Sequence, residues 1–136
     1  MPDPDRTPPA PPPALDARLA PGRAAFNRGE FFAAHELWED VWHDLAGDER
    51  VLVQGLIQIA AGLHHLQRGR TGAAARVLSR GVSKLATATG TAAPASPRAP
   101  ATSLPIAALA HDVARLLETL AASGTEHRVD ADAIRF

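Results

Sequence analysis

Residues 31–45 read FFAAHELWEDVWHDL, and this stretch gathers the side chains best suited to chemistry. It contains both tryptophans of the chain and two of its six histidines. The pair His35-Glu36 could open a zinc-binding helical motif, but that motif requires a second histidine at i+4. Position i+4 is Glu39, so the sequence excludes the motif. A histidine and a carboxylate on adjacent helical turns could still supply two metal ligands.

A metal site would need further ligands from the next predicted helix, because a catalytic zinc normally takes three protein ligands. His64 and His65 are the candidates there. One hypothesis is therefore a divalent ion (zinc, manganese or iron) held by His35, Glu39 and one of these histidines. Glu39 is then also the candidate catalytic base. Apart from this possible metal, the sequence indicates no certain cofactor.

The alternative is a structural polar network. At 100° per residue, His35 falls inside the apolar stripe of its helix and Glu39 lies at the edge of that stripe. The next helix carries Gln54 and Gln58 on a side without charge. The candidates for binding or for the network are His35, Glu39, Trp42, Gln54 and Gln58. In the network, Glu39 orients His35 and the glutamines tie the helices in register, and the spacing alone favours this over a ligand site.

The elements that position these residues are predicted to be helices. Apolar periodicity and helix-stop signals predict helices at about 15–27, 30–46, 48–68, 71–85 and 103–122, with Ser103 capping the last. No stretch alternates like a strand. We expect an all-α bundle of about five helices, built from antiparallel helix hairpins.

The chain is expected to form one helical domain, residues 14–136. Residues 1–13 are proline-rich and are predicted to be a disordered arm. Residues 87–102 are rich in alanine and proline and are predicted to be a mobile linker inside the domain. Ile134 and Phe136, in the tail, are expected to dock on the bundle.

A weak internal repeat has a period of 40 residues: Arg28-Gly29 aligns with Arg68-Gly69, and Leu45-Ala46 with Leu85-Ala86. Repeats of this kind are typical of helix hairpins, including the tetratricopeptide type.

The composition limits the partners. The formal net charge is −1 and there is no cysteine. The charge balance gives no reason to expect nucleic acid, and the polar side chains of the longest uncharged run argue against a membrane span. The absence of cysteine and of an apolar leader fits a cytoplasmic protein. An unknown protein partner or self-association remains open.

The pattern of motifs resembles a family of small bacterial and archaeal helical proteins, domain of unknown function 309. The resemblance rests on these elements, which cover about residues 22–86: Asn27 and Gly29, Phe31-Phe32, His35-Glu36, Glu39, Trp42, Gln54-Gly55, Gln58, Gly69 and Gly72-Ala73. Arg70 departs from the family, which often has asparagine there. The resemblance implies an all-α bundle, and such proteins are catalogued as predicted metal-dependent hydrolases.

Two functions are therefore expected to compete. The first is a metal-dependent hydrolase centred on His35 and Glu39. The second is a non-enzymatic, tetratricopeptide-like interaction module, in which the polar residues are structural. A solvent-open cavity reaching His35 favours the first, and a charge-poor groove with an aromatic rim favours the second.

Overall fold

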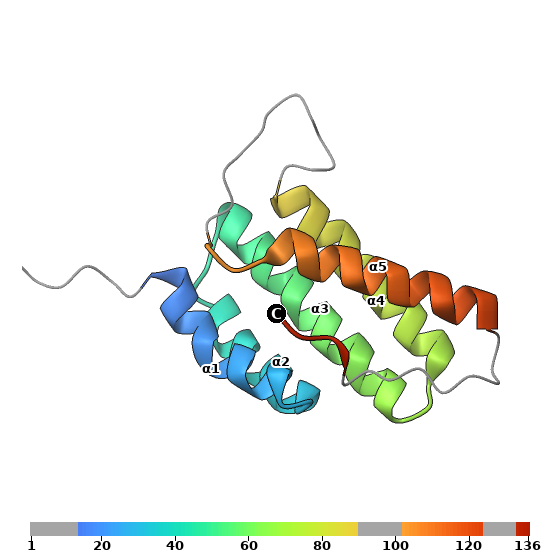
Figure 1. Cartoon of the computed structure of the whole chain (residues 1–136). Helices are drawn as coiled ribbons and strands as arrows, with labels where there is room; N and C mark the ends of the chain where they lie inside the picture. Colours follow the sequence, from blue (N-terminus) through green and yellow to red (C-terminus); the bar gives the residue numbers. More distant parts are fainter. Residues whose placement is uncertain (1–13, 90–101, 124–132) are drawn as a thin grey trace, which may run out of the picture.

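Five α-helices dominate the computed structural model, which describes residues 14–89, 102–123 and 133–136 (Figure 1). The helices are α1 (Leu15–Asn27), α2 (Phe31–Trp42), α3 (Gly47–Gln67), α4 (Thr71–Ala88) and α5 (Ile106–Ser123). These described residues contain no strand, so the predicted all-α bundle is confirmed. The predicted arm and residues 90–101 of the predicted linker lie outside the described residues. Residues 87 and 88 of that linker belong to α4 instead.

Two helix hairpins, α1–α2 and α3–α4, share the same turn. The first helix of each hairpin, α1 or α3, ends shortly before a glycine with positive φ, which is 79° at Gly29 and 76° at Gly69. The residue after each glycine donates its N–H to the carbonyl five residues back, at 2.9 Å in both turns. This is the Schellman arrangement, which glycine favours because it has no Cβ to clash. The 40-residue sequence repeat therefore corresponds to two hairpins with one turn geometry.

The α3–α4 pair makes the most extensive helix contact in the bundle. Glycines on both helices allow this approach. A Cβ at Gly62 would lie 2.6 Å from the Leu78 side chain, and one at Gly81 would lie 2.7 Å from Ile59. Such distances leave no room for alanine, so the two backbones pack closer than ordinary side chains would permit.

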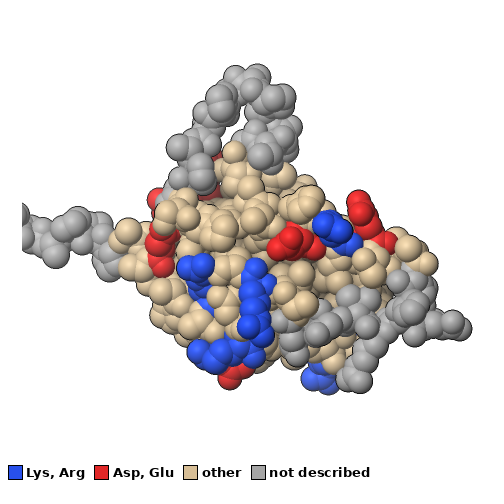
Figure 2. All heavy atoms as spheres, viewed as in Figure 1, with Lys and Arg blue, Asp and Glu red and all other residues tan. Residues whose placement is uncertain are grey.

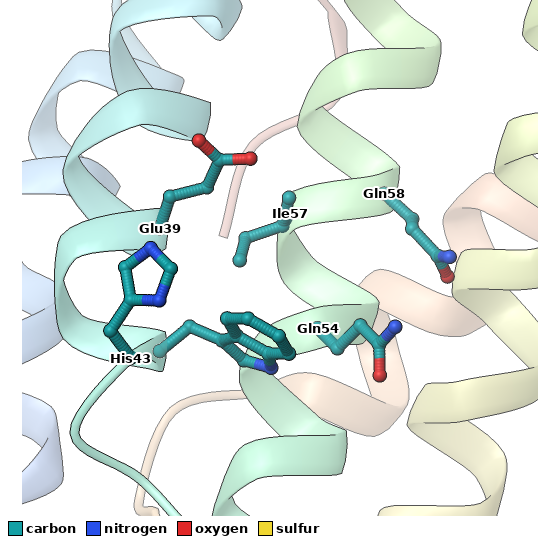
Figure 3. A pocket seen from close by; sticks show the side chains of 6 residues that line it. Glu39, His43, Gln54, Ile57 and Gln58 are labelled. Carbon is teal, nitrogen blue, oxygen red and sulfur yellow. The ribbon is translucent and has the colours of Figure 1, made fainter.

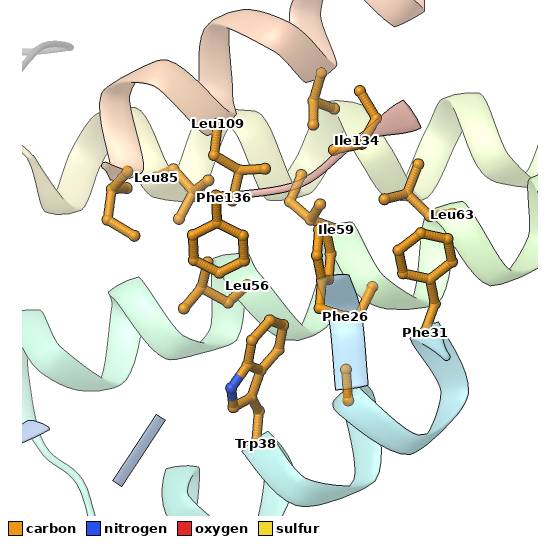
Figure 4. Close-up of a cluster of buried hydrophobic side chains, with 14 of the residues drawn as sticks. Phe26, Phe31, Trp38, Leu56, Ile59, Leu63, Leu85, Leu109, Ile134 and Phe136 are labelled. Atoms are coloured by element: carbon orange, nitrogen blue, oxygen red, sulfur yellow. The ribbon is translucent and has the colours of Figure 1, made fainter. Parts of the chain in front are cut away.

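An aromatic cluster fills the core where α1, α2 and the tail meet (Figure 4). Phe26, Phe31 and Trp38 are fully buried. Phe136, at the end of the described tail, packs edge-on against Phe26 with ring centroids 5.1 Å apart. Ile134 is also buried, so both tail residues dock on the bundle as expected. In Figure 1 the tail crosses in front of α3.

The predicted ends of two helices are wrong. The second helix was expected to reach residue 46, but α2 ends at Trp42 and a short turn leads to α3. Ser103 was expected to cap the fifth helix, which instead begins at Ile106. The Ser103 N–H donates to the Asp16 carboxylate at 3.0 Å, and the Ser103 hydroxyl bonds the same oxygen. Ser103 thus links the segment that precedes α5 to α1. This contact joins residues far apart in the sequence, so it cannot be predicted from neighbouring residues.

The surface carries both signs of charge. On the face shown in Figure 2, acidic and basic side chains both occur and neither sign covers the face continuously. None of the helices in the described ranges is long and apolar enough to cross a membrane.

Candidate functional site

Helices α2 and α3 run antiparallel, with Phe32 beside His64 at one end and Trp42 beside Arg50 at the other. Along one side of this pair, residues at helical spacing from each helix form what we call the α2–α3 seam. Its residues are Phe32, His35, Glu39 and Trp42 from α2, His43 directly after this helix, and Gln54, Ile57, Gln58, Ala61, His64 and His65 from α3. The seam lines two hollows, and every candidate site residue predicted from the sequence belongs to it.

The larger hollow has a volume of about 430 Å³ and is lined by Glu39, Trp42, His43, Gln54, Ile57 and Gln58. Ligand pockets commonly measure about 300–1,000 Å³, so this hollow can accept a small group or part of a chain. In Figure 3, Glu39 lies on α2 and His43 directly follows its last residue, whereas the amide ends of Gln54 and Gln58 point away from α2. Glu39 is the one acidic side chain in the lining.

The smaller hollow has a volume of about 190 Å³ and is lined by Phe32, His35, Ala61, His64 and His65. The Phe32 ring is 53% exposed, stacks on His35 at a centroid distance of 5.8 Å, and lies 5.3 Å from His64. Burial lowers the pKa of His64, and the positive charge of Arg68 adds to this effect. His64 is therefore neutral near pH 7, which suits an apolar, aromatic surface.

The His35 and Glu39 side chains are in close contact between the two hollows. His35 Nε2 lies 3.1 Å from Glu39 Oε1, and the side chains are 23% and 48% exposed. The helical spacing i, i+4 puts the two groups on adjacent turns, as their positions in the sequence require. Because Nε2 faces the carboxylate, Glu39 fixes the orientation of the imidazole and leaves Nδ1 on the inner side.

Four buried polar atoms of the seam have no hydrogen-bond partner among the described residues. They are His35 Nδ1, Trp42 Nε1, Gln58 Oε1 and His65 Nδ1. Leaving such an atom unpaired costs about 1–3 kcal/mol. Their concentration on one side of one helix pair is therefore unusual, because buried polar groups are generally satisfied.

The four residues of the metal hypothesis (His35, Glu39, His64 and His65) do not assemble into a metal centre. Within the described ranges, no three His, Asp or Glu side chains come close enough together to hold an ion. Phe32 contacts both His35 and His64, and the His64 and His65 rings are 6.5 Å apart. The donors present do not fit a three-ligand metal centre.

The predicted polar network of His35, Glu39, Trp42, Gln54 and Gln58 stays a prediction. Glu39 pairs with His35 as the network requires, but no hydrogen bond in the described structure joins Gln54 or Gln58 to either residue. The structure thus joins His35 and Glu39 on α2, whereas Gln54 and Gln58 on α3 are not hydrogen-bonded to them.

Sequence reasoning missed two residues of this region. Phe32 forms the exposed aromatic wall of the smaller hollow, and its spacing of three from His35 could have indicated this. Arg50 places its guanidinium 3.9 Å from the centre of the Trp42 ring, in a cation–π contact. Its place in the first turn of α3 was a signal, because an antiparallel partner brings that turn to the end of α2.

Comparison with known proteins agrees with the resemblance seen in the sequence. The model of the family Domain of unknown function (DUF309) matches residues 19–77 of this chain. A relative described as "Uncharacterized protein" from Aquifex aeolicus (strain VF5) is 32% identical over 69 residues, which are 50% of this chain and 21% of the relative. The chain thus spans about a fifth of that relative's length. No solved structure matches the chain.

Proposed function

We propose that the chain is a non-enzymatic helical binding module and that the α2–α3 seam takes up an extended peptide segment of a protein partner. The observation that carries this proposal is the row of four unpaired polar atoms along the seam. A peptide main chain offers an N–H donor and a carbonyl acceptor at every residue. Because the indole N–H of Trp42 and the amide oxygen of Gln58 are buried, their side chains would have to turn toward the groove to pair with this main chain. Pairing would then remove the cost of leaving both atoms unsatisfied.

The dimensions of the seam support a short segment. From Phe32 to Trp42 the α2 side of the seam advances by ten residue steps, or about 15 Å at about 1.5 Å per residue. An extended peptide advances about 3.3 Å per residue, so about five residues would cover this length.

The charge of the seam supports a binding role. Glu39 is its one acidic side chain, Phe32 is an exposed aromatic wall, and His64 has a lowered pKa. A charge-poor groove with an aromatic rim suits a partner segment that is largely uncharged. A basic residue of the peptide opposite Glu39 would fix the position of the peptide along the seam.

One observation favours a second candidate, a metal-dependent hydrolase. The His35–Glu39 pair lies beside solvent-open hollows and could provide two ligands or an oriented base. A metal centre of the usual kind needs a further ligand, which the described residues do not provide. This makes the binding module the better-supported function.

The test of the binding module uses the full chain as bait for a library of displayed peptides. Selected peptides are then measured by calorimetry against the intact chain and against Trp42→Phe, which keeps an aromatic ring but removes the indole N–H. Gln58→Leu removes the amide oxygen at similar volume. We expect each variant to weaken binding about tenfold, the effect of losing about 1.4 kcal/mol.

Glu36→Ala is the matched control, because Glu36 is an exposed acid on α2 outside the seam. It should bind as tightly as the intact chain. Selected peptides whose affinity is insensitive to both seam variants would refute the assignment of the seam.

The hydrolase alternative has its own test. Chelator-treated chain is melted with zinc, manganese or iron added, and the same series is run on His35→Ala. A binding metal would raise stability by about 2.7 kcal/mol at a hundredfold excess over its Kd. We expect no such gain with any of the three ions. A gain that His35→Ala abolishes would make the hydrolase the leading function.

A further inference from the structure

Asn27, the last residue of α1, holds the main chain of the tail with two hydrogen bonds. Its Nδ2 donates to the Phe136 main-chain oxygen at 2.9 Å, and the Phe136 N–H donates to Asn27 Oδ1 at 2.9 Å. One side-chain amide thus satisfies both polar groups of a single peptide residue. This pairing reads the backbone of the bound residue and is independent of its side chain.

The Phe136 side chain enters an aromatic pocket at the same place. The ring packs edge-on against Phe26 and lies 6.0 Å from Trp38. Arg23 covers it with its guanidinium 5.6 Å from the ring centre, and its Nε donates to the Phe136 oxygen at 2.5 Å. Ile134, two residues earlier, provides a second buried anchor (Figure 4). The site therefore suits an Ile-x-Phe segment: Asn27 binds the main chain of the Phe residue, the aromatic pocket holds its ring, and the Ile side chain is buried two residues earlier.

The turn between α1 and α2 does not require the Asn27 side chain. The open carbonyls at the end of α1 accept main-chain N–H groups from Arg28, Gly29 and Glu30. In the matching turn of the second hairpin, Gln67 occupies the position of Asn27, and the same main-chain bonds form. The amide of Asn27 is therefore available to the tail. Asn27 belongs to the Asn-x-Gly motif of the sequence, and this motif is not part of the α2–α3 seam.

We infer that Arg23, Asn27, Phe26 and Trp38 form a peptide-docking site that recognises an Ile-x-Phe segment of a partner protein and that the chain's own tail occupies in cis. The tail is the template that shows what fits. A tethered segment acts at an effective concentration of about millimolar, so an identical tail on a second copy gains nothing by exchange. A partner segment that adds contacts beyond the two anchors can displace it. The tail therefore sets an affinity threshold for access to the site.

The experiment empties the site in the full chain with the double variant Ile134→Ala/Phe136→Ala and adds the peptide ADAIRF. Calorimetry measures binding, and circular dichroism measures melting. We expect the peptide to bind and to raise the melting temperature of the variant. Asn27→Ala in the same background should weaken binding at least tenfold. The peptide ADAIRA should show at least the same loss. Peptides with a free and an amidated carboxyl end reveal whether the terminal charge contributes.

A second measurement keeps the inference open to refutation if the double variant does not fold. The intact chain, labelled with isotopes, is titrated with ADAIRF to several times the effective concentration of its own tethered tail, which is about millimolar. The Phe136 amide signal of the docked tail should then decline as the peptide replaces it, while the spectrum of α4 stays unchanged. A folded double variant that ignores the peptide would refute the inference. A Phe136 amide signal that persists throughout the titration of the intact chain would also refute it. Gel filtration that shows a dimer formed by exchange of tails would refute it as well.

Discussion

At the scale of single residues, the acids of α2 fall into two environments. Glu36 is exposed and outside the seam, whereas Glu39 pairs with His35. Glu36→Ala should change the free energy of unfolding by less than about 0.5 kcal/mol, as surface substitutions usually do. Glu39→Ala should cost between about 0.2 and 1 kcal/mol, because contacts between partly exposed polar side chains contribute little. Urea titrations of both variants measure the difference, and a larger loss in Glu36→Ala would contradict this placement.

Asp16 gives the structure a pH dependence. Hydrogen bonds from Ser103 and Thr102 lower the pKa of Asp16 below its ordinary value of 3.8. The folded state then favours the ionised carboxylate. The resulting stability is present above the unfolded pKa and is lost as the pH falls through the folded pKa. Asp16→Asn should therefore be less stable than the intact chain at pH 7, and the gap should narrow below pH of about 4.

Urea midpoints of the intact chain and Asp16→Asn, followed from pH 7 to pH 2, measure this gap. Other carboxylates titrate in both proteins and largely cancel in the comparison. A difference in urea midpoint that stays constant across the range would show that the charge of Asp16 does not stabilise the segment that precedes α5.

At the scale of elements, α1 approaches α2 through a glycine. A Cβ at Gly22 would lie 2.2 Å from Trp38 Nε1, and Trp38 is fully buried. The Trp38 indole also donates to the Leu19 carbonyl at 3.1 Å, so the ring cannot shift freely. Gly22→Ala should therefore destabilise the fold by about 2 kcal/mol, within the range for overpacked cores.

Gly72 offers the matched control for this substitution. It also lies in a helix, but a Cβ there would meet only the Arg76 side chain, at 3.7 Å. Gly72→Ala should stabilise the chain by about 0.5 kcal/mol, because alanine loses less backbone entropy on folding. Thermal melts of both variants give opposite signs if the packing argument holds.

Local signals were sufficient to predict the five helices, although not the ends of two of them. The glycine at each turn and the apolar periodicity of α3 are properties of neighbouring residues, so they are visible in the sequence. The contact of Ser103 with Asp16 joins residues far apart, so it depends on the assembled bundle. At the site, the i, i+4 spacing of His35 and Glu39 predicted their pairing. The directions of Gln54 and Gln58 depend on side-chain rotamers, which spacing does not determine.

At the scale of the whole molecule, stability should be unevenly distributed. The α3–α4 pair is interlocked through glycines, and α3 has nine buried residues whereas α2 has three. Amides in the middle of α3 and α4 should therefore exchange hydrogen only on global unfolding. Amides of α2 should exchange through local opening at lower free energy. Native-state exchange measured with rising urea would show this order, and equal protection of α2 would contradict it.

The placement of the two tryptophans gives the molecule an optical consequence. Trp38 is fully buried beside the tail, whereas Trp42 lies in the partly open seam under the Arg50 guanidinium. Trp38 should emit at short wavelength and resist an aqueous quencher such as acrylamide, and Trp42 should be quenched readily. The intact chain would then show two emitting populations, which Trp42→Phe reduces to the protected one. Undocking of the tail would redden the protected emission, while occupation of the seam would shield the other, so one spectrum separates the two events.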